Sequence, residues 1–275
     1  MSAETSFAAC EAAVRAHDPD RFLSALFAPA ALRGPLFALY AFNHELARVA
    51  ESVTQPMLGE IRLQWWRETV EQARAGRPRE HDVARALAVA FARHELPFGP
   101  FDAMLDARVF DSSGETLENL SALEAYADAT SGNLMRLAAR VLGGSDAAAR
   151  AAGTAHALMG VARAIPFHAS RRKLFLPLDM LADAGVHSGD VLAGKPGGIG
   201  RVIGKLSARA RELLAEARAL PKPGAALPAF LPAATVPAMA KALARPGFDP
   251  FRDVAEVPVY RRQLAMLAAT LRGGI

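Results

Sequence analysis

Cysteine is almost absent from the 275-residue sequence, where Cys10 is the only one. A single cysteine excludes an intramolecular disulfide framework and a cysteine-rich metal site, so we expect the chain to fold in a reducing compartment. A large excess of charge of one sign is absent as well, because 32 Lys and Arg face 28 Asp and Glu and leave a net charge of +4. We therefore expect no nucleic-acid partner.

Long apolar runs are also missing. No stretch of about 18 uncharged apolar residues occurs, so we expect no membrane-spanning helix. Residues 225–240 come nearest, but they contain Pro228, Pro232 and Pro237, and we consider them only as a contact with a membrane surface. Glu4 and Glu11 disagree with a cleaved signal or transit peptide. The expected location is the cytoplasm, with peripheral contact at the inner membrane as a further hypothesis.

Period-two alternation of β-branched residues is absent, which excludes a sheet-based fold. Apolar residues make up 52% of the chain and recur at three- and four-residue steps, as on the buried face of a helix. We predict one all-α domain over residues 1–275, with residues 1–17 loosely ordered. Its helices are predicted to start at Pro19, Pro35, Leu58, His81, Pro100, Ser121 (a capping box with Glu124), Ser145, Leu178, Ile199, Leu227 and Val257.

Buried faces can be assigned for two of these helices. Leu39, Phe42, Leu46, Val49 and Val53 share one side of the helix that starts at Pro35. In the next helix, the same spacing predicts a face of Ile61, Trp65 and Thr69.

Several local motifs have an ordinary structural interpretation beside a chemical one. Asp102 and Asp106 lie one helical turn apart and could hold Mg²⁺, but surface helices often carry such pairs. The segment 194–200 is rich in glycine, yet it does not follow a strand and does not end in Lys-Ser/Thr, so we interpret it as a loop. His44, His156 and His168 form no metal-type spacing, and a partly buried structural role is favoured for His44 and His156.

The segment "RAIPFHASRRKLFLP", residues 163–177, combines Arg163 with the run Arg171-Arg172-Lys173. Such a cluster can bind an anion. It also complements the dipole at the end of a helix without any ligand. From these residues alone, the helix-end interpretation is favoured.

Segments spread over residues 20–180 shift the preference for the basic cluster from a helix end toward anion binding. Phe22, Pro29, Arg33 and Leu39-Tyr40-Ala-Phe42, then Trp65, Tyr126 and the 163–177 segment, resemble in order and spacing the squalene/phytoene synthase superfamily. The resemblance implies an all-α isoprenoid-synthase fold, a helical bundle around a central cavity. It also implies that Tyr40, Asn43, Trp65 and Tyr126 line this cavity.

In active members of that superfamily, two DxxxD motifs hold Mg²⁺ ions that bind the diphosphates of two prenyl substrates. Carboxylate oxygens suit Mg²⁺, and aspartates at i and i+4 point the same way from a helix. Here the first motif falls on Ala47 and Glu51 and the second on Ala164 and His168. We therefore expect no catalytic residues of the usual kind, no metal and no cofactor. Pro166 is expected to kink the helix at the second motif.

The strings "AFNHELARVAESV" and "RAIPFHASRRKLFLPLDM" are similar to a divergent branch of the superfamily. That branch includes a mitochondrial assembly factor of respiratory complex I. The resemblance implies a non-catalytic role in complex I assembly, with complex I subunits or assembly intermediates as partners, in a bacterial relative.

Two alternatives stay open. Arg163, Arg171 and Lys173 could still hold an isoprenoid ligand, a prenyl diphosphate, or support a residual head-to-head prenyltransferase. The chain could also be an interaction protein that uses exposed apolar helices at a membrane surface.

Overall fold

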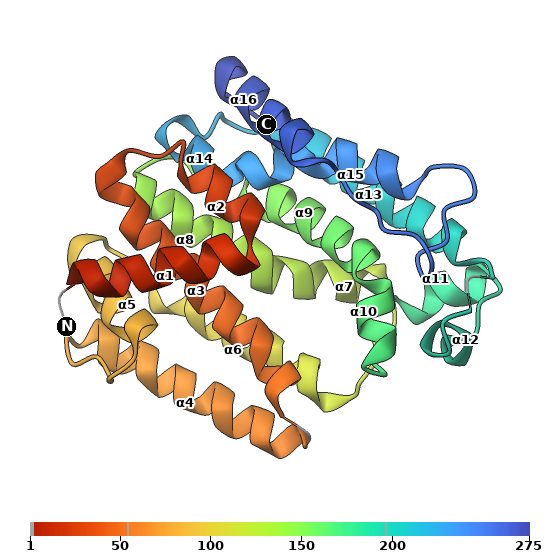
Figure 1. Ribbon diagram of the computed structural model, residues 1–275, viewed down its shortest axis with the longest axis horizontal. Helices are drawn as coiled ribbons and strands as arrows, with labels where there is room; N and C mark the ends of the chain where they lie inside the picture. The colour runs from red at the N-terminus through yellow and green to blue at the C-terminus, as the bar shows by residue number, and fades with distance from the viewer. Residues whose placement is uncertain (1–2, 54, 196) are drawn as a thin grey trace.

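The computed structural model describes residues 3–53, 55–195 and 197–275, and every regular element in these ranges is helical (Figure 1). The all-α prediction is confirmed. The first half of the chain contains α1 (Ala3–His17), α2 (Pro19–Ala25), α3 (Ala30–Ser52), α4 (Pro56–Arg74), α5 (Asp82–Arg93), α6 (Phe98–Ser113), α7 (Leu120–Ala127), a π-helical turn η1 (Asp128–Gly132) and α8 (Asn133–Leu142). The second half contains α9 (Ala149–Arg163), α10 (Ile165–Ser170), α11 (Leu178–Asp183), α12 (Ser188–Leu192), α13 (Ile199–Ala219), the 3₁₀ turns η2 (Gly224–Ala226) and η3 (Leu231–Thr235) on either side of α14 (Leu227–Phe230), α15 (Val236–Leu243) and α16 (Val259–Arg272).

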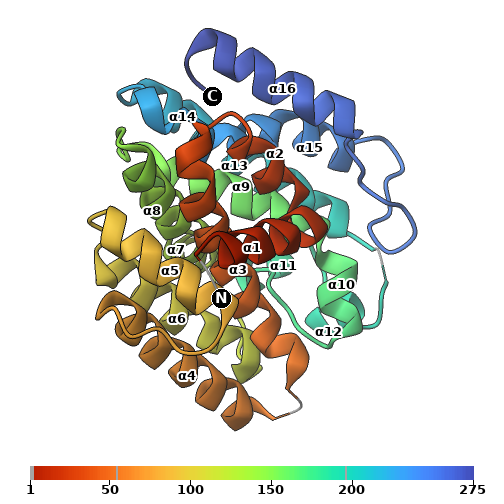
Figure 2. The same ribbon diagram turned by 60° about the vertical axis from the view of Figure 1, so that its left-hand side comes forward.

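The helices form a bundle in which α3, α8 and α9 run through the middle (Figures 1 and 2). Helices α4 and α5 lie on one side of this centre, and α13, α15 and α16 lie on the other. Helix α9 packs most extensively on α13, and α3 on α1. Figure 1 shows α10, α11 and α12 together at one end of the bundle. The centre is apolar, with large fully buried side chains such as Tyr40, Phe42 and Phe101.

The N-terminal segment is ordered, contrary to the prediction of a loose segment over residues 1–17. Met1 and Ser2 lie outside the described residues, but residues 3–17 form α1. Ser6, Cys10 and Val14 recur at four-residue steps and are buried, where α1 packs against α3 and α5. These residues are small or weakly apolar, so the buried face was hard to detect from the sequence.

Helix α3 begins at Ala30, five residues before the predicted start, and Pro35 lies inside it. Pro29 precedes the first residue. The Arg33 side chain donates to the backbone oxygens of Ala28 and Leu26, which stabilises the turn before α3. Four residues of the predicted buried face, Leu39, Phe42, Leu46 and Val49, are buried.

The buried tryptophan of α4 is Trp66, and the predicted face of Ile61, Trp65 and Thr69 is only partly correct. Thr69 is buried, but Ile61 and Trp65 are exposed. The face that packs on the body consists of Leu63, Trp66, Val70 and Ala73. Trp66 is the tryptophan that packs inward, and its ring contacts Phe42 edge to face, with ring centroids 5.7 Å apart.

The helix predicted to start at Ser121 is interrupted by the π-helical turn η1. Its cap is Asn119, whose side chain accepts a hydrogen bond from Ala122 N at 2.9 Å. Glu124 is drawn away from the expected capping box because it pairs with Arg209 of α13 at 2.7 Å. Helix α8 ends at Gly143, which adopts the left-handed conformation that glycine favours at a helix end.

The helix predicted from Ser145 begins at Ala149 and breaks at Ala164, between α9 and α10. The predicted kink at Pro166 is therefore confirmed. Helix α13 starts at Ile199 as predicted, whereas the short α12 was not anticipated. The described part of the segment 194–200 is a turn that leads into α13, and Pro196 lies outside the described residues.

The apolar stretch that begins after Pro223 is part of the core. It does not form the exposed membrane-contact surface that we considered from the sequence. Residues Gly224–Leu243 are long and apolar enough to cross a membrane by composition. However, 72% of the apolar 18-residue stretch within this segment is buried inside the protein. Phe230, Leu231 and Val236 are fully buried. Membrane contact through residues 225–240 is therefore wrong, because this segment already packs against the rest of the bundle.

Candidate functional site

A cavity of about 370 Å³ opens into the middle of the bundle between α2, α3, α6, α7, η1, α9 and α10. Nine of the predicted site residues line it, from segments far apart in the sequence. They are Asn43, Ala47, Glu51, Tyr126, Arg163, Ala164, His168, Arg171 and Lys173.

Tyr40 and Trp65 do not line this cavity. Tyr40 is fully buried in the core behind it, with the Arg21 guanidinium 5.9 Å from its ring centroid. Trp65 lies on the outer side of α4, where the Arg79 guanidinium stacks 5.1 Å from its ring. Trp65 is directed outward because its neighbour Trp66 occupies the buried face of α4.

The two pairs of positions that the resemblance assigns to the motifs border the same space. Ala47 and Glu51 lie one turn apart on α3, and both border the cavity. On the other wall, His168 N donates to the Ala164 backbone oxygen at 2.9 Å, so these two positions keep the i and i+4 relation across the helix break. The frame of two opposed helical turns is present, and one carboxylate, Glu51, remains on it.

The carboxylates of the cavity do not fit a cluster of Mg²⁺ ions. Besides Glu51, the cavity contains Asp18, Asp20 and Asp111, and each of these is paired with an arginine. Among the described residues, no group of three or more His, Cys, Asp and Glu side chains is arranged to hold a metal ion.

The alternative magnesium pair, Asp102 and Asp106, lies on the surface of α6. Arg67 of α4 forms ion pairs with both carboxylates. This arrangement supports the ordinary interpretation of a surface charge pair, with Arg67 in the place that a cation would need.

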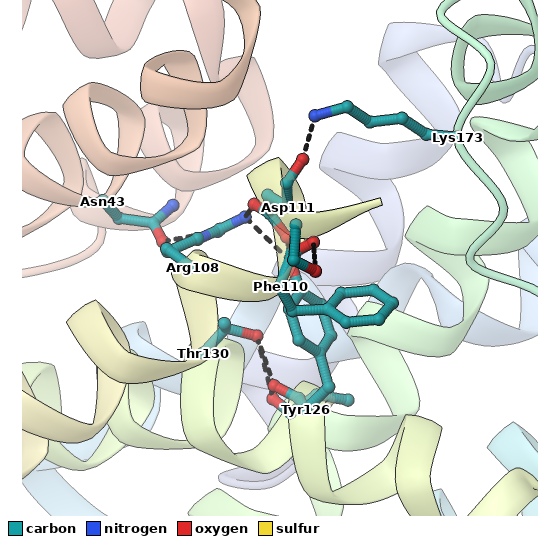
Figure 3. Close-up of polar contacts among 9 residues, drawn as sticks. Asn43, Arg108, Phe110, Asp111, Tyr126, Thr130 and Lys173 are labelled. Atoms are coloured by element: carbon teal, nitrogen blue, oxygen red, sulfur yellow. Dashed lines mark hydrogen bonds and ion pairs between the residues drawn. The ribbon is translucent and has the colours of Figure 1, made fainter. Parts of the chain in front are cut away.

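A polar network joins three helices on the wall beneath Lys173 (Figure 3). The Tyr126 hydroxyl donates to Asp111 Oδ1 at 2.7 Å, and Arg108 Nη1 lies 2.9 Å from Asp111 Oδ2. Arg108 also donates to the Tyr126 hydroxyl at 3.0 Å and to Asn43 Oδ1 at 3.4 Å. Charged groups inside a protein need such partners, because an unpaired buried charge is costly.

Burial acts strongly on the ionisation of this network. It raises the pKa of the Tyr126 hydroxyl, so Tyr126 stays protonated and can donate to Asp111. Burial alone would lower the pKa of Arg108, but Tyr126 and Asp111 more than offset it and raise that pKa. The network therefore keeps a fixed charge distribution at neutral pH.

The basic side of the cavity is less completely paired. Lys173 donates to the Asp111 backbone oxygen, and burial lowers the pKa of Lys173. The Arg171 guanidinium lies 3.8 Å from the centroid of the Phe167 ring. Glu51 borders the same space, but among the described residues Arg171 forms no ion pair with it or with another carboxylate. Arg163 is exposed on the same wall and has no ion-pair partner within the described ranges. These cations can accept an anionic ligand, and the neighbouring Phe167 and Phe175 supply apolar surface.

Two histidines of the cavity are neutral at physiological pH. Burial lowers the pKa of His156 to about 4 and that of His168 to about 4. His168 packs on Phe175 with ring centroids 4.3 Å apart. His44 lies outside this lining and stacks on His17 at 4.3 Å. His168 thus presents an uncharged, partly apolar side chain to the cavity.

Sequence reasoning missed a second charged layer of the cavity. Arg21 Nη1 pairs with Asp18 at 2.7 Å, and Arg262 Nη1 of α16 pairs with Asp20 at 2.6 Å. Asp18 caps α2, since it accepts from Arg21 N, but nothing in the sequence connects Asp20 with a residue near the C-terminus.

The fold and the cavity define the class of protein. The structure superposes on a crystal structure of a dehydrosqualene synthase in complex with ligand with a TM-score of 0.81, over 98% of this chain and 97% of that one, at 18% sequence identity. The chain therefore has the isoprenoid-synthase fold.

The family follows from the sequence comparison. Residues 14–263 match the squalene/phytoene synthase family, and the chain belongs to it. It is 34% identical over 249 residues to the human NADH dehydrogenase (ubiquinone) complex I assembly factor 6, covering 88% of this chain and 75% of that protein. It is 30% identical over 220 residues to the phytoene synthase of Rhodobacter capsulatus, covering 78% of this chain and 65% of that enzyme.

Proposed function

We propose that this protein acts in the assembly of respiratory complex I, and that its cavity no longer ionises prenyl diphosphates. One observation carries the second half of the proposal. The helical turns that would bear four aspartates carry Ala47, Glu51, Ala164 and His168, and the other cavity carboxylates are held by arginines.

The assembly role is supported by similarity to complex I assembly factor 6 of several animals, with 31% identity to the bovine protein over 95% of this chain. The partners would be complex I subunits or assembly intermediates. The location that we propose with this role is the cytoplasm, with peripheral contact at the inner membrane.

The proposal is tested by deletion of the gene in its source organism. Assembled complex I, measured by native gel electrophoresis and NADH:quinone oxidoreductase activity, is expected to fall. The prenyl-lipid profile is expected to stay unchanged. Normal levels of complex I in the deletion strain would remove the assembly role, and a changed lipid profile would restore a biosynthetic one.

A direct assay complements the genetic test. The purified protein is incubated with farnesyl or geranylgeranyl diphosphate and Mg²⁺, with and without a reductant, and released diphosphate is measured. We expect none above the level of an Asn43→Leu variant, because both proteins lack the metal-binding carboxylates. Release that depends on Mg²⁺ would show a residual prenyltransferase.

A second function is favoured by the unpaired cations of the cavity. Arg163 and Arg171 border the cavity and form no ion pair with a carboxylate of the described residues, and Lys173 and the Phe167 ring lie beside them. This arrangement suits an anion that carries an apolar chain, such as a prenyl diphosphate held without metal. Calorimetry with farnesyl diphosphate in EDTA tests it. An Arg163→Gln/Arg171→Gln variant should bind roughly tenfold more weakly or worse.

The matched control for that measurement is Arg140→Gln/Arg150→Gln. Both residues are exposed arginines outside the cavity lining. Equal affinities of the two double variants would show that the ligand responds only to net charge.

A further inference from the structure

The exposed apolar side chains of the protein gather at one edge. Of the fifteen large hydrophobic residues exposed in the described ranges, seven lie on α16 or in the turn after α2, which places nearly half of them on one surface. Figures 1 and 2 both show α16 as the outermost helix at this edge. The seven residues are Leu26, Phe27, Val259, Tyr260, Leu264, Leu267 and Leu271.

Helix α16 is apolar on two opposite faces. Its inner face buries Met266 and Ala269 against Leu227 and Leu231. The outer face carries Tyr260, Leu264, Leu267 and Leu271, whose side chains are 56%, 59%, 45% and 80% exposed. At about 100° per residue, these four side chains fall within an arc of about 60°. Packing in the monomer accounts for the inner face only.

The outer row continues into a groove. Tyr260, Leu264 and Leu267 of α16 line it on one side, and Leu26 and Phe27 of the turn after α2 line it on the other. The groove has a volume of about 530 Å³. It lies apart from the central cavity, since none of these five residues borders that cavity.

The charges on helix α16 itself are of one sign. Helix α16 contains Arg261, Arg262 and Arg272 and no Asp or Glu. Arg262 is turned inward to Asp20, whereas Arg261 and Arg272 are exposed beside the leucines. Two copies of this helix packed together would bring these arginines close without a carboxylate to offset them, which disfavours a second copy as the occupant.

We propose that the outer face of α16, together with Leu26 and Phe27, docks the protein onto a membrane surface that contains anionic phospholipids. A helix with a row of leucines and flanking arginines inserts its apolar side at the boundary of headgroups and acyl chains, while the arginines meet the phosphates. Tyr260 at the start of the row suits this interfacial layer. The inference does not rest on the proposed assembly role or on any ligand of the cavity.

Vesicle flotation of the full chain tests the proposal. The vesicles contain phosphatidylcholine alone or phosphatidylcholine mixed with phosphatidylglycerol. We expect the wild-type protein to float with the mixed vesicles, and much less with the neutral ones or at high salt. The variant Leu264→Gln/Leu267→Gln/Leu271→Gln should lose roughly tenfold or more of the bound fraction.

The control variant is Met57→Gln/Leu58→Gln/Ile61→Gln on α4. Those three side chains are exposed by 62%, 45% and 59%, close to the values on α16, and they should not alter flotation. An Arg261→Glu/Arg272→Glu variant leaves the apolar row intact and should also lose binding to the mixed vesicles. This variant decides the matter if the leucine variant does not fold.

Several results would overturn the proposal. These are a wild-type protein that stays unbound in excess mixed lipid, equal binding to neutral vesicles, and equal losses in the α4 and α16 variants. A dimer of the wild-type protein that dissociates in the leucine variant, measured by analytical ultracentrifugation, would assign this face to a second copy.

Discussion

Arg262 Nη1 lies 2.6 Å from Asp20 Oδ1, and this ion pair joins the last helix of the chain to the second across 242 residues. Both side chains are largely buried, with 14% and 8% exposed. Both also border the central cavity. The pair therefore closes the wall between α2 and α16 with matched charges.

Replacement of Arg262 by Met is expected to destabilise the protein strongly. The substitution keeps much of the apolar volume but leaves the Asp20 carboxylate buried without its partner, at a cost of roughly 3 kcal/mol. Urea unfolding followed by circular dichroism measures the change. The double variant Asp20→Asn/Arg262→Met should recover part of the loss, because it removes the unpaired charge.

The control for this variant is Arg15→Met. Arg15 also pairs with a carboxylate at 2.7 Å, but both partners, Arg15 and Glu11, are exposed. The expected cost is about 0.5 kcal/mol or less. Equal losses for Arg262→Met and Arg15→Met would contradict the importance of burial at Asp20.

A close approach of two glycines holds α9 against the π-helical turn. A Cβ atom added at Gly153 would lie 2.6 Å from Gly132 Cα and 2.7 Å from Gly132 N, and backbone atoms cannot move aside locally. We expect Gly153→Ala to cost about 1–3 kcal/mol of the free energy of unfolding. Gly160→Ala, in the same helix, meets no atom within 4 Å and should stabilise by about 0.5–1 kcal/mol through helix propensity. Thermal unfolding of both variants checks the opposite signs.

The sequence predicted the parts of this molecule that depend on local periodicity or on a recognisable string. The start of helix α13 and the break near Pro166 follow from spacing within one or two turns, whereas the four motif positions were implied only by the family resemblance. The cavity lining at Asn43 and Tyr126 also agreed with the family resemblance. What stayed hidden depends on contacts between distant segments. Trp66 is buried and Trp65 is not, because the ring of Trp66 packs against Phe42 in the core.

The charged layer of the cavity was hidden for the same reason. The residues around Arg108 in the sequence form no recognisable motif. Only the fold brings Tyr126 and Asn43 into contact with its guanidinium group. Asp20 likewise finds its partner near the opposite end of the chain. Helix α1 escaped because its buried side chains, Ser6, Cys10 and Val14, carry little apolar signal.

The stability of the protein should decrease as the pH falls from 6.5 toward 4. His156 and His168 have an ordinary pKa of 6.5, and burial lowers it to about 4 in the folded state. Between these values the unfolded chain binds protons that the folded chain does not, so the free energy of unfolding declines. Their contribution is complete above pH 6.5, and its loss reaches on the order of 2 kcal/mol for each histidine.

Urea unfolding at pH 7 and pH 5 measures this decline. A His168→Gln variant should show a shallower dependence on pH, because one of the histidines whose pKa is lowered by burial is gone. His187→Gln, which changes an exposed histidine, should keep the wild-type slope. A stability that is flat between pH 7 and pH 5 would contradict neutral, buried imidazoles in the cavity.

The opposed turns of α3 and α10 make a restored metal site testable. In the variant Ala47→Asp/Glu51→Asp/Ala164→Asp/His168→Asp, two carboxylates stand one turn apart on each wall, since His168 N still bonds to the Ala164 oxygen at 2.9 Å in the parent fold. Mg²⁺ should then strengthen binding of farnesyl diphosphate by roughly tenfold or more. The four carboxylates together supply oxygen ligands in a number that Glu51 by itself cannot provide. Calorimetry with Mg²⁺ and with EDTA measures the difference, and the wild-type protein should show none.

The variant Asp102→Asn/Asp106→Asn provides the control, because those carboxylates are occupied by Arg67 and their loss should leave ligand binding unchanged. If Mg²⁺ strengthens binding to the wild-type protein as much as to the restored variant, the cavity holds metal through other groups, and the loss of the aspartates does not explain its chemistry.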